Sequence, residues 1–313
     1  MRASSLLAGI AALTGAVAAQ GSSALQAILS QAGTGNYTYP TALTQGIIPK
    51  ALHSHNDYWR PVPLYSALSA GAVSVEADVW LINDILYVGH ERSALSPNRT
   101  LDSLYIQPLL SVLASLNPQP PAAPFAVPGA KNGVYDTASS QTLYLWIDVK
   151  TDGASTWPRV VAALEPLRRA GYLTSVVNGS TVRSGQVTVI GTGNTPLGLV
   201  QPVATRDYFW DAPVATLNST YGNITKEVSP VASADFAAIF GEVRNRTFSE
   251  GQASLLKSQV GVAHSKGIAV RYWDLPGWPV GTRNAVWRTL WDAGVDLINV
   301  DDLQGAAAFW EGD

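Results

Sequence analysis

Two carboxylates point the same way from one strand-like segment of this chain. Over residues 73–80, the alternation of side chains along a strand puts Glu76 and Asp78 on one face and apolar residues on the other. Asp148 and Lys150 share a face in the same manner, directly after a run of buried-strand composition. Closely spaced buried carboxylates repel each other, so they share a proton or hold a cation. Three hard oxygen ligands and no cysteine favour one Mg²⁺ or Ca²⁺ ion over zinc.

Histidine is scarce, and three of the four histidines follow strand-like segments that lie near these acids. His53 and His55 close a first segment, and His90 closes the segment 85–88. Two imidazoles beside an anionic group held by a metal can act as base and acid in breaking a phosphoester bond. The fourth histidine, His264, lies in the middle of a helical pattern and is interpreted as a packing or surface residue.

Short apolar segments alternate with helical patterns along the chain. The predicted strands are 47–53, 73–80, 85–88, 143–149, 187–190, 208–210, 268–273 and 297–300. The predicted helices are 64–70, 104–116, 160–170, 249–265 and 285–293, several of which stop at glycine. Alternation over this length predicts a parallel sheet closed into a single-domain α/β barrel of the TIM-like (β/α)8 type. Residues 118–133, rich in Pro, Gly and Ala, are interpreted as a loop inserted between barrel units.

Composition excludes several classes of protein. The 313 residues are 47% hydrophobic and 14% charged, against about 25% charged in an ordinary soluble domain, so the chain is not disordered. A net charge of −3 without a basic run argues against nucleic acid or an anionic membrane as the main partner. The absence of cysteine excludes disulfide scaffolds, thiol catalysis and zinc sites built on cysteine.

The N-terminus reads as a secretion signal. Residues 1–19 combine Arg2, a short apolar stretch and a run of small residues suited to cleavage, and the stretch is too short for a stable membrane span. The expected organisation is this signal, an extension over 20–45 and the barrel over 46–313. Six glycosylation motifs support a eukaryotic secretory route, at Asn36, Asn98, Asn178, Asn218, Asn223 and Asn245. The secreted protein is expected to be a monomer.

The chain resembles the phospholipase-C-like phosphodiesterase superfamily, which includes glycerophosphodiester phosphodiesterases and spider-venom sphingomyelinase D enzymes. It is most similar to the fungal family named after altered inheritance of mitochondria protein 6. The N-terminal part of the resemblance is carried by His53-x-His55-Asn56-Asp57, Pro63-Leu64-x-x-Ala67-Leu68-x-x-Gly71, Val75-Glu76-x-Asp78-Val79 and Leu86-x-Val88-x-His90. It continues through Asp148-Val149-Lys150-Thr151, 263–273 and 294–301.

This resemblance implies a barrel with one divalent cation and a pair of catalytic histidines. The cation would lie on Glu76, Asp78 and Asp148. The pair would be His90 with either His53 or His55, of which His55 is favoured as the reacting group and His53 as its support. One histidine would assist attack on phosphorus and the other would protonate the leaving oxygen, while the metal neutralises the charge of the phosphate.

The sequence departs from the glycerophosphodiesterase pattern around these histidines. Ser54 stands where those enzymes have an Arg that clamps phosphate, and Glu91 replaces the Asp that follows the second histidine. Lys150 and Arg271 are expected to contact the phosphate in its place. Trp273, which shares a strand face with Arg271, and Asn56 complete the expected substrate-binding residues.

The predicted function is a secreted, metal-dependent phosphodiesterase acting on a glycerophosphodiester or a phospholipid headgroup. The substrate, and the choice between hydrolysis and cyclic-phosphate formation, stay open. One alternative is a zinc amidohydrolase that begins with His-x-His and recruits Lys150, His264 and Asp301, although that site needs two more strand-end histidines and only His90 lies at a strand end. Another alternative is a barrel that binds a ligand without cleaving it, with the abundant Trp and Tyr residues holding a sugar or lipid headgroup.

Overall fold

The structure, a computed structural model, describes residues 30, 39, 41–118 and 129–311. Leu43–Asp313 form one compact unit. The predicted signal at 1–19, most of the extension at 20–45 and residues 119–128 of the loop at 118–133 lie outside the described residues. No helix within the described ranges is both long and apolar enough to cross a membrane.

Parallel strands form the centre of this unit. In spatial order they are β8 (Phe209–Trp210), β7 (Val187–Gly193), β4 (Leu143–Val149), β2 (Ala72–Ile82), β1 (Lys50–Ser54), β12 (Leu297–Val300), β11 (Ala269–Trp273), β10 (Val231–Asp235) and β9 (Ala212–Pro213). Each strand therefore lies beside its neighbour in the chain, and the first strand pairs with the last. This is the strand order of a TIM barrel.

The two edges of the sheet meet in one short segment. Asp211 alone separates β8 from β9, and this segment pairs with β7 on one side and with β10 on the other. The Trp210 amide donates to the Val228 carbonyl at 2.8 Å, whereas the Asp211 amide donates to the Gly191 carbonyl at 2.9 Å. Consecutive amides of this segment thus point to opposite neighbours, as they do in a strand inside a sheet. We therefore describe β8 and β9 as the two halves of one barrel strand. The predicted TIM-like barrel is confirmed.

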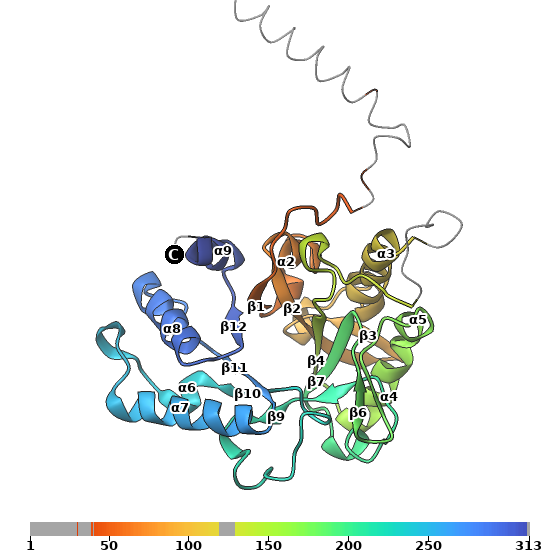
Figure 1. The fold of residues 1–313 in the computed structure, drawn as a ribbon. Helices are drawn as coiled ribbons and strands as arrows, with labels where there is room; N and C mark the ends of the chain where they lie inside the picture. Colours follow the sequence, from red (N-terminus) through yellow and green to blue (C-terminus); the bar gives the residue numbers. More distant parts are fainter. Residues whose placement is uncertain (1–29, 31–38, 40, 119–128, 312–313) are drawn as a thin grey trace, which may run out of the picture. The chain divides into compact units, whose positions relative to one another are not determined.

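The helices lie outside the strands (Figure 1). They are α2 (Tyr65–Ser69), α3 (Gln107–Leu116), α4 (Gly153–Ala163), α5 (Glu165–Arg169), α6 (Phe236–Phe240), α7 (Glu250–Ser265), α8 (Val280–Asp292) and α9 (Leu303–Glu311). The connections on both sides of the β8–β9 segment contain only short 3₁₀ turns, Leu197–Leu199 and Val214–Thr216. The connections before and after the strand that closes the barrel, both within the described residues, therefore contribute no α-helix to the outer layer of helices.

One predicted strand lies outside the barrel, and one barrel strand escaped prediction. The segment β3 (Ile85–Val88) pairs antiparallel with the end of β2 as a hairpin. Asn83 and Asp84 adopt positive φ angles of 49° and 63°, as a two-residue hairpin turn requires. The missed strand, β10, has the sequence VASAD, whose small and polar residues lack the apolar signature of a strand. A second small hairpin, β5 (Ser175–Val177) with β6 (Thr181–Arg183), lies outside the main sheet.

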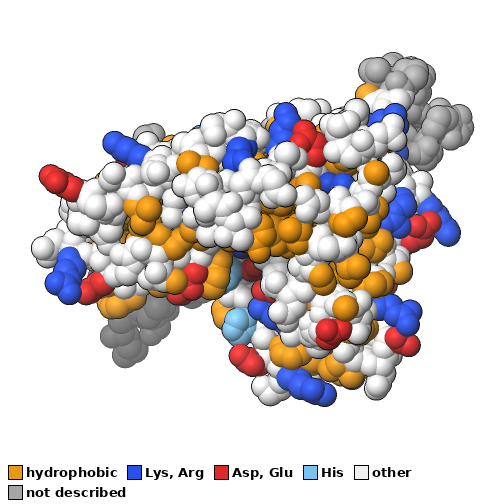
Figure 2. All heavy atoms as spheres, turned by 90° about the horizontal axis from the view of Figure 1, so that it is seen from below, with side chains coloured by type: hydrophobic (Ala, Val, Ile, Leu, Met, Phe, Trp, Pro, Cys, Tyr) orange, Lys and Arg blue, Asp and Glu red, His pale blue; other side chains and the backbone are white. Residues whose placement is uncertain are grey.

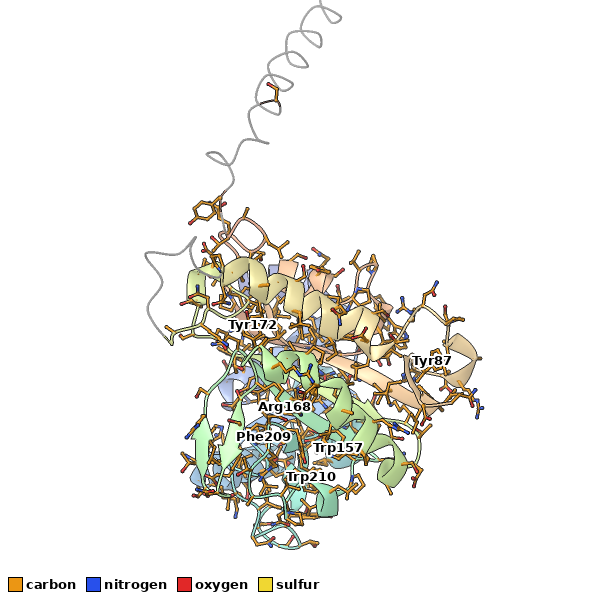
Figure 3. The ribbon with its side chains drawn as sticks, turned by 90° about the vertical axis from the view of Figure 1, so that its right-hand side faces the viewer. Tyr87, Trp157, Arg168, Tyr172, Phe209 and Trp210 are labelled. Carbon is orange, nitrogen blue, oxygen red and sulfur yellow. The ribbon has the colours of Figure 1, made fainter. Side chains whose placement is uncertain are left out.

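Helices α4 and α5 hold the closing segment in place. The Trp157 ring of α4 packs edge-on against Tyr208 at a centroid distance of 5.5 Å. The guanidinium of Arg168 on α5 donates to both carboxylate oxygens of Asp207, at 2.5 and 2.9 Å. Figure 3 shows Trp157 and Arg168 near Phe209 and Trp210. This packing attaches the residues directly before β8 to the two helices between β4 and β7.

Asp211, at the point of closure, predicts a pH-dependent stability. Its Oδ2 accepts hydrogen bonds from Thr192 at 2.8 Å and Ser233 at 2.6 Å, while its Oδ1 is buried without a partner among the described residues. Burial raises the pKa of Asp211 from 3.8 to about 6. The folded state thus binds this proton more tightly than the unfolded state, and stability falls as the pH rises from 3.8 towards 6.

Asp211→Asn should therefore stabilise the protein at pH 7.5 and have little effect near pH 4. A shift of this size corresponds to ~3 kcal/mol in the free energy of unfolding, to be measured by urea denaturation at both pH values. A destabilised variant at pH 7.5 would show that the hydrogen bonds to the charged carboxylate outweigh the cost of burying it.

Candidate active site

Three carboxylates meet at the ends of neighbouring strands. Glu76 and Asp78 come from β2, Asp148 comes from β4, and Asp78 and Asp148 are paired in the register of the two strands. One oxygen of each carboxylate lies within 4.8 Å of the others, and Glu76 and Asp78 are buried. The ammonium of Lys150 lies 2.7 Å from Asp148 and 3.0 Å from Asp78, so it partly neutralises the cluster.

The cluster forms part of a cleft of about 570 Å³. This cleft lies at the carboxyl ends of the barrel strands, where the active sites of such barrels are built. Figure 2 shows histidine side chains in a hollow of the molecular surface, with acidic and basic side chains beside them. The lining residues that the sequence had singled out are His55, Asn56, Glu76, Asp78, His90, Asp148, Lys150, Arg271 and Trp273.

His55 lies between two carboxylates. Its Nδ1 is 2.8 Å from Asp301 Oδ1, and its Nε2 is 3.6 Å from Glu76 Oε2. Burial alone would lower the pKa of His55, but the hydrogen bond to Asp301 and the charge of Glu76 outweigh it and raise the pKa. These two contacts therefore stabilise the protonated imidazole relative to that of a free histidine.

His90 lies on the other flank of the cluster, just beyond β3. Its Nδ1 is 3.4 Å from Asp78 Oδ2 and 3.1 Å from the Tyr58 hydroxyl. The side chain is 43% exposed, and the ring of Trp59 packs against it at a centroid distance of 5.1 Å. With Nδ1 turned towards buried groups, Nε2 is the nitrogen left for chemistry in the cleft.

His53 is buried inside the barrel and does not line the cleft. Its Nδ1 lies 2.7 Å from Ser74 Oγ, and its Nε2 lies 2.5 Å from a guanidinium nitrogen of Arg271. Since Arg271 only donates, Nε2 accepts and the ring is neutral with its proton on Nδ1. Burial and the charge of Arg271 lower the pKa of His53 to about 3. This environment suits a supporting group better than a proton-transfer group.

Arg271 forms the floor of the cleft. Its guanidinium contacts His53, lies 3.7 Å from Glu76 and stacks over the Trp146 ring at 4.1 Å. Its Nε is buried without a partner among the described residues. Trp273, two residues further along β11, is 37% exposed at the mouth of the cleft. The two side chains thus lie at different depths of the same cleft.

The three carboxylates differ in proton affinity. Burial would raise the pKa of Glu76, but the charges of His55 and Arg271 hold it well below its usual value. Burial and the charges of Glu76 and Asp148 raise the pKa of Asp78 to about 7. Burial also raises the pKa of Asp148. A cluster whose members resist full ionisation gains from a bound cation, and three carboxylate oxygens suit Mg²⁺ or Ca²⁺.

The loop after β1 is anchored by a carboxylate that lies outside the cleft. Asp57 is fully buried and accepts hydrogen bonds from Ser54 Oγ at 2.7 Å, the Leu64 amide at 2.6 Å and the Tyr105 hydroxyl at 3.1 Å. Asn56 has a positive φ of 49°, which turns its amide towards Glu76 Oε2 at 3.2 Å. The resulting tight turn carries His55 and Asn56 of the cleft before the anchor and Tyr58, which contacts Asp78, after it.

Sequence reasoning missed two residues of the site. Tyr58 directs its hydroxyl at Asp78, and Asp301 pairs with His55. From the sequence, Asp301 was placed in the last-strand part of the resemblance and in the zinc alternative, but it was given no role beside His55. A tyrosine directly after the His-x-His-Asn-Asp motif was the available signal for the first. The position of Asp301 one residue beyond the last strand was the signal for the second.

Some sequence-derived candidates lie elsewhere. His264 lies on α7 and pairs with Asp296 at 2.9 Å, just before β12 and therefore at the opposite end of the barrel from the cleft. A zinc site that requires His264 beside Lys150 is not assembled. Asn36 lies outside the described residues, and the other five glycosylation motifs have exposed asparagines, at Asn98, Asn178, Asn218, Asn223 and Asn245.

Comparison with known proteins adds a family assignment. Residues 41–211 match the family described as the AIM6-like phosphodiesterase domain. The chain is 49% identical over 283 residues to an altered inheritance of mitochondria protein 6 homolog of Arthroderma benhamiae, with 88% of each chain covered. It is 37% and 33% identical to proteins of that name from Eremothecium gossypii and Saccharomyces cerevisiae, covering 82% and 83% of this chain and 69% and 71% of theirs. No solved structure matches.

Gly193 gives a direct test of the acid cluster. It has a φ of +61°, and a Cβ on this residue would lie 1.9 Å from Asp148 Oδ1. Gly193→Ala should displace the Asp148 carboxylate and weaken the binding of Mg²⁺ or Mn²⁺, measured by calorimetry, by about 10-fold or more. Gly198→Ala, where a Cβ would meet open space, is the control. Equal metal affinity of Gly193→Ala and the unchanged protein would remove Asp148 from the metal site.

Proposed function

This chain belongs to the AIM6-like phosphodiesterase family, and on that premise we propose that it is a metal-dependent phosphodiesterase using His55 and His90 as its acid–base pair. The observation that carries the proposal is the arrangement of these two histidines. Each imidazole has Nδ1 at a carboxylate, Asp301 or Asp78, and each lines the cleft that contains the three-carboxylate cluster. Paired imidazoles beside a cation site can supply the acid, the base and the charge neutralisation that catalyse phosphoester cleavage.

The proposed reaction begins with attack of a hydroxyl on phosphorus. One imidazole takes the proton of the attacking hydroxyl, which belongs either to water or to the substrate itself. The other imidazole gives a proton to the oxygen that leaves as the phosphorus–oxygen bond breaks. Asp301 orients the His55 ring through a hydrogen bond and stabilises its charged form, while Asp78 lies 3.4 Å from Nδ1 of His90.

Glu76, Asp78 and Asp148 are the proposed ligands of one divalent cation. When bound, that cation would neutralise the negative charge that the phosphate develops. Lys150 and Arg271 would add positive charge on two other sides of the cleft, which offsets the loss of an arginine at the position of Ser54. His53 would hold the Arg271 guanidinium from below.

The proposed substrate is a small or lipid-derived phosphodiester. Trp273 at the mouth of the cleft and Asn56 beside His55 are the proposed contacts to the group attached to phosphate. The ring of Trp59, 57% exposed beside His90, offers a further apolar surface at the same mouth. The proposed route is secretory, in line with the predicted signal at 1–19 and the exposed glycosylation motifs.

Turnover by purified protein is the direct test. Glycerophosphodiesters, lysophospholipids, sphingomyelin and phosphatidylinositol are offered with Mg²⁺ or Ca²⁺, and phosphorus NMR identifies the product as an open or cyclic phosphate. Chelation should abolish turnover. His55→Asn and His90→Asn should each lower kcat/KM by about 10²- to 10⁴-fold, because each removes a proton-transfer group.

His264→Asn serves as the control, because His264 lies at the other end of the barrel. Turnover that survives chelation, or that both histidine variants retain, would overturn the proposed mechanism. Metal binding without turnover of any of these substrates would instead favour the ligand-binding barrel.

The secretory route has its own test. Expression of the full chain in a filamentous fungus should yield protein in the medium, and its mass should fall on treatment with an endoglycosidase. Deletion of residues 2–19 should retain the protein inside the cell without glycans. Secretion of the deletion variant would remove the signal function from this segment.

A further inference from the structure

The Tyr58 hydroxyl lies at a junction between groups of the cleft. It is 2.8 Å from Asp78 Oδ2 and 3.1 Å from His90 Nδ1, and it is in close contact with Asn56 Oδ1. The residue is only 2% exposed, so these contacts are shielded from water. The hydroxyl therefore joins a carboxylate of the acid cluster to one of the two cleft histidines.

The number of protons available at the Tyr58 hydroxyl determines which nitrogen of His90 is protonated. A phenol has one proton to donate, and two oxygen acceptors, from Asp78 and Asn56, face it. The phenol therefore donates its proton to one of these oxygens. Towards His90, the phenol oxygen can only accept a hydrogen bond. His90 Nδ1 must then carry a proton and donate it, which leaves Nε2 unprotonated in the neutral ring.

We propose that Tyr58 is a positioning residue that holds His90 in the Nδ1–H tautomer, with Nε2 free to accept a proton in the cleft. The geometric part of this proposal stands on the hydrogen bonds alone. Its catalytic consequence, that His90 Nε2 is prepared to take a proton during turnover, rests on the proposed function.

Contacts of the neighbouring residues restrict the position of Tyr58. Its backbone carbonyl accepts a hydrogen bond from Arg99, and the preceding residue is the buried anchor Asp57. The ring of the next residue, Trp59, packs against His90. Glu91, beside His90 in sequence, is exposed and makes no hydrogen bond to His90 among the described residues. The tyrosine thus supplies a contact that the neighbouring acid does not.

Nitrogen NMR of the metal-free full chain tests the tautomer without any assay of activity. With ¹⁵N-labelled histidine at a pH where the ring is neutral, the His90 signals should show a protonated Nδ1 and a bare Nε2. His90→Asn identifies those signals by removing them. In Tyr58→Phe, which deletes only the hydroxyl, the pattern should move towards the Nε2–H tautomer.

Tyr135→Phe is the matched control, because Tyr135 is also buried and donates one hydrogen bond, to the Ala72 carbonyl at the far end of β2. It should leave the His90 signals unchanged. An unchanged pattern in Tyr58→Phe, or an equal change in both variants, would overturn the proposal.

Kinetics at saturating metal test the catalytic consequence. Tyr58→Phe should lower kcat by about 10- to 100-fold with KM nearly unchanged, as expected when the support of a reacting group is lost. Equal kcat for Tyr58→Phe and the unchanged protein would refute this consequence. If the NMR result holds but no variant or wild-type sample turns over any phosphodiester, the proposed function fails while the tautomer assignment stands.

Discussion

Carboxylates inside a barrel must be compensated, and the inner side chains of this protein follow from that constraint. Glu76 and Asp78 are almost fully buried, and a buried charge without partners would cost several kcal/mol. Arg271, itself fixed by His53, faces Glu76, while Lys150 faces Asp78. These polar and charged side chains form a layer that extends across the barrel from β1 to β11. The charges in the cleft therefore interact with those in the barrel core.

The sequence predicts the parts of the fold that carry strong apolar patterns. Segments such as 143–149 and 297–300 match strands β4 and β12 residue for residue, because buried parallel strands read as continuous apolar runs. Strand β10 was missed because its residues are small or polar. They are buried because neighbouring elements cover them, and not because they are themselves apolar. The hairpin strand β3 was placed in the barrel because a pattern of single residues does not encode the direction of pairing.

The candidate site divides in the same way. The acid cluster was predictable, because alternation along β2 and β4 fixes the shared face of its members. Tyr58 and Asp301 were not, because each reaches the site through a contact between segments far apart in sequence. His53 and His55 are equivalent by alternation, and only the buried environment of the first and the Asp301 contact of the second distinguish them.

Lys150 gives the site a property that the three carboxylates alone would lack. Its ammonium lies 2.7 Å from Asp148 and 3.0 Å from Asp78, so the chain carries an internal counterion for two of the three carboxylates. A metal ion placed among these carboxylates would have to displace the ammonium or share their oxygens with it. Such an exchange would favour a small divalent ion over sodium or potassium, because its higher charge density gives a stronger attraction to the carboxylates.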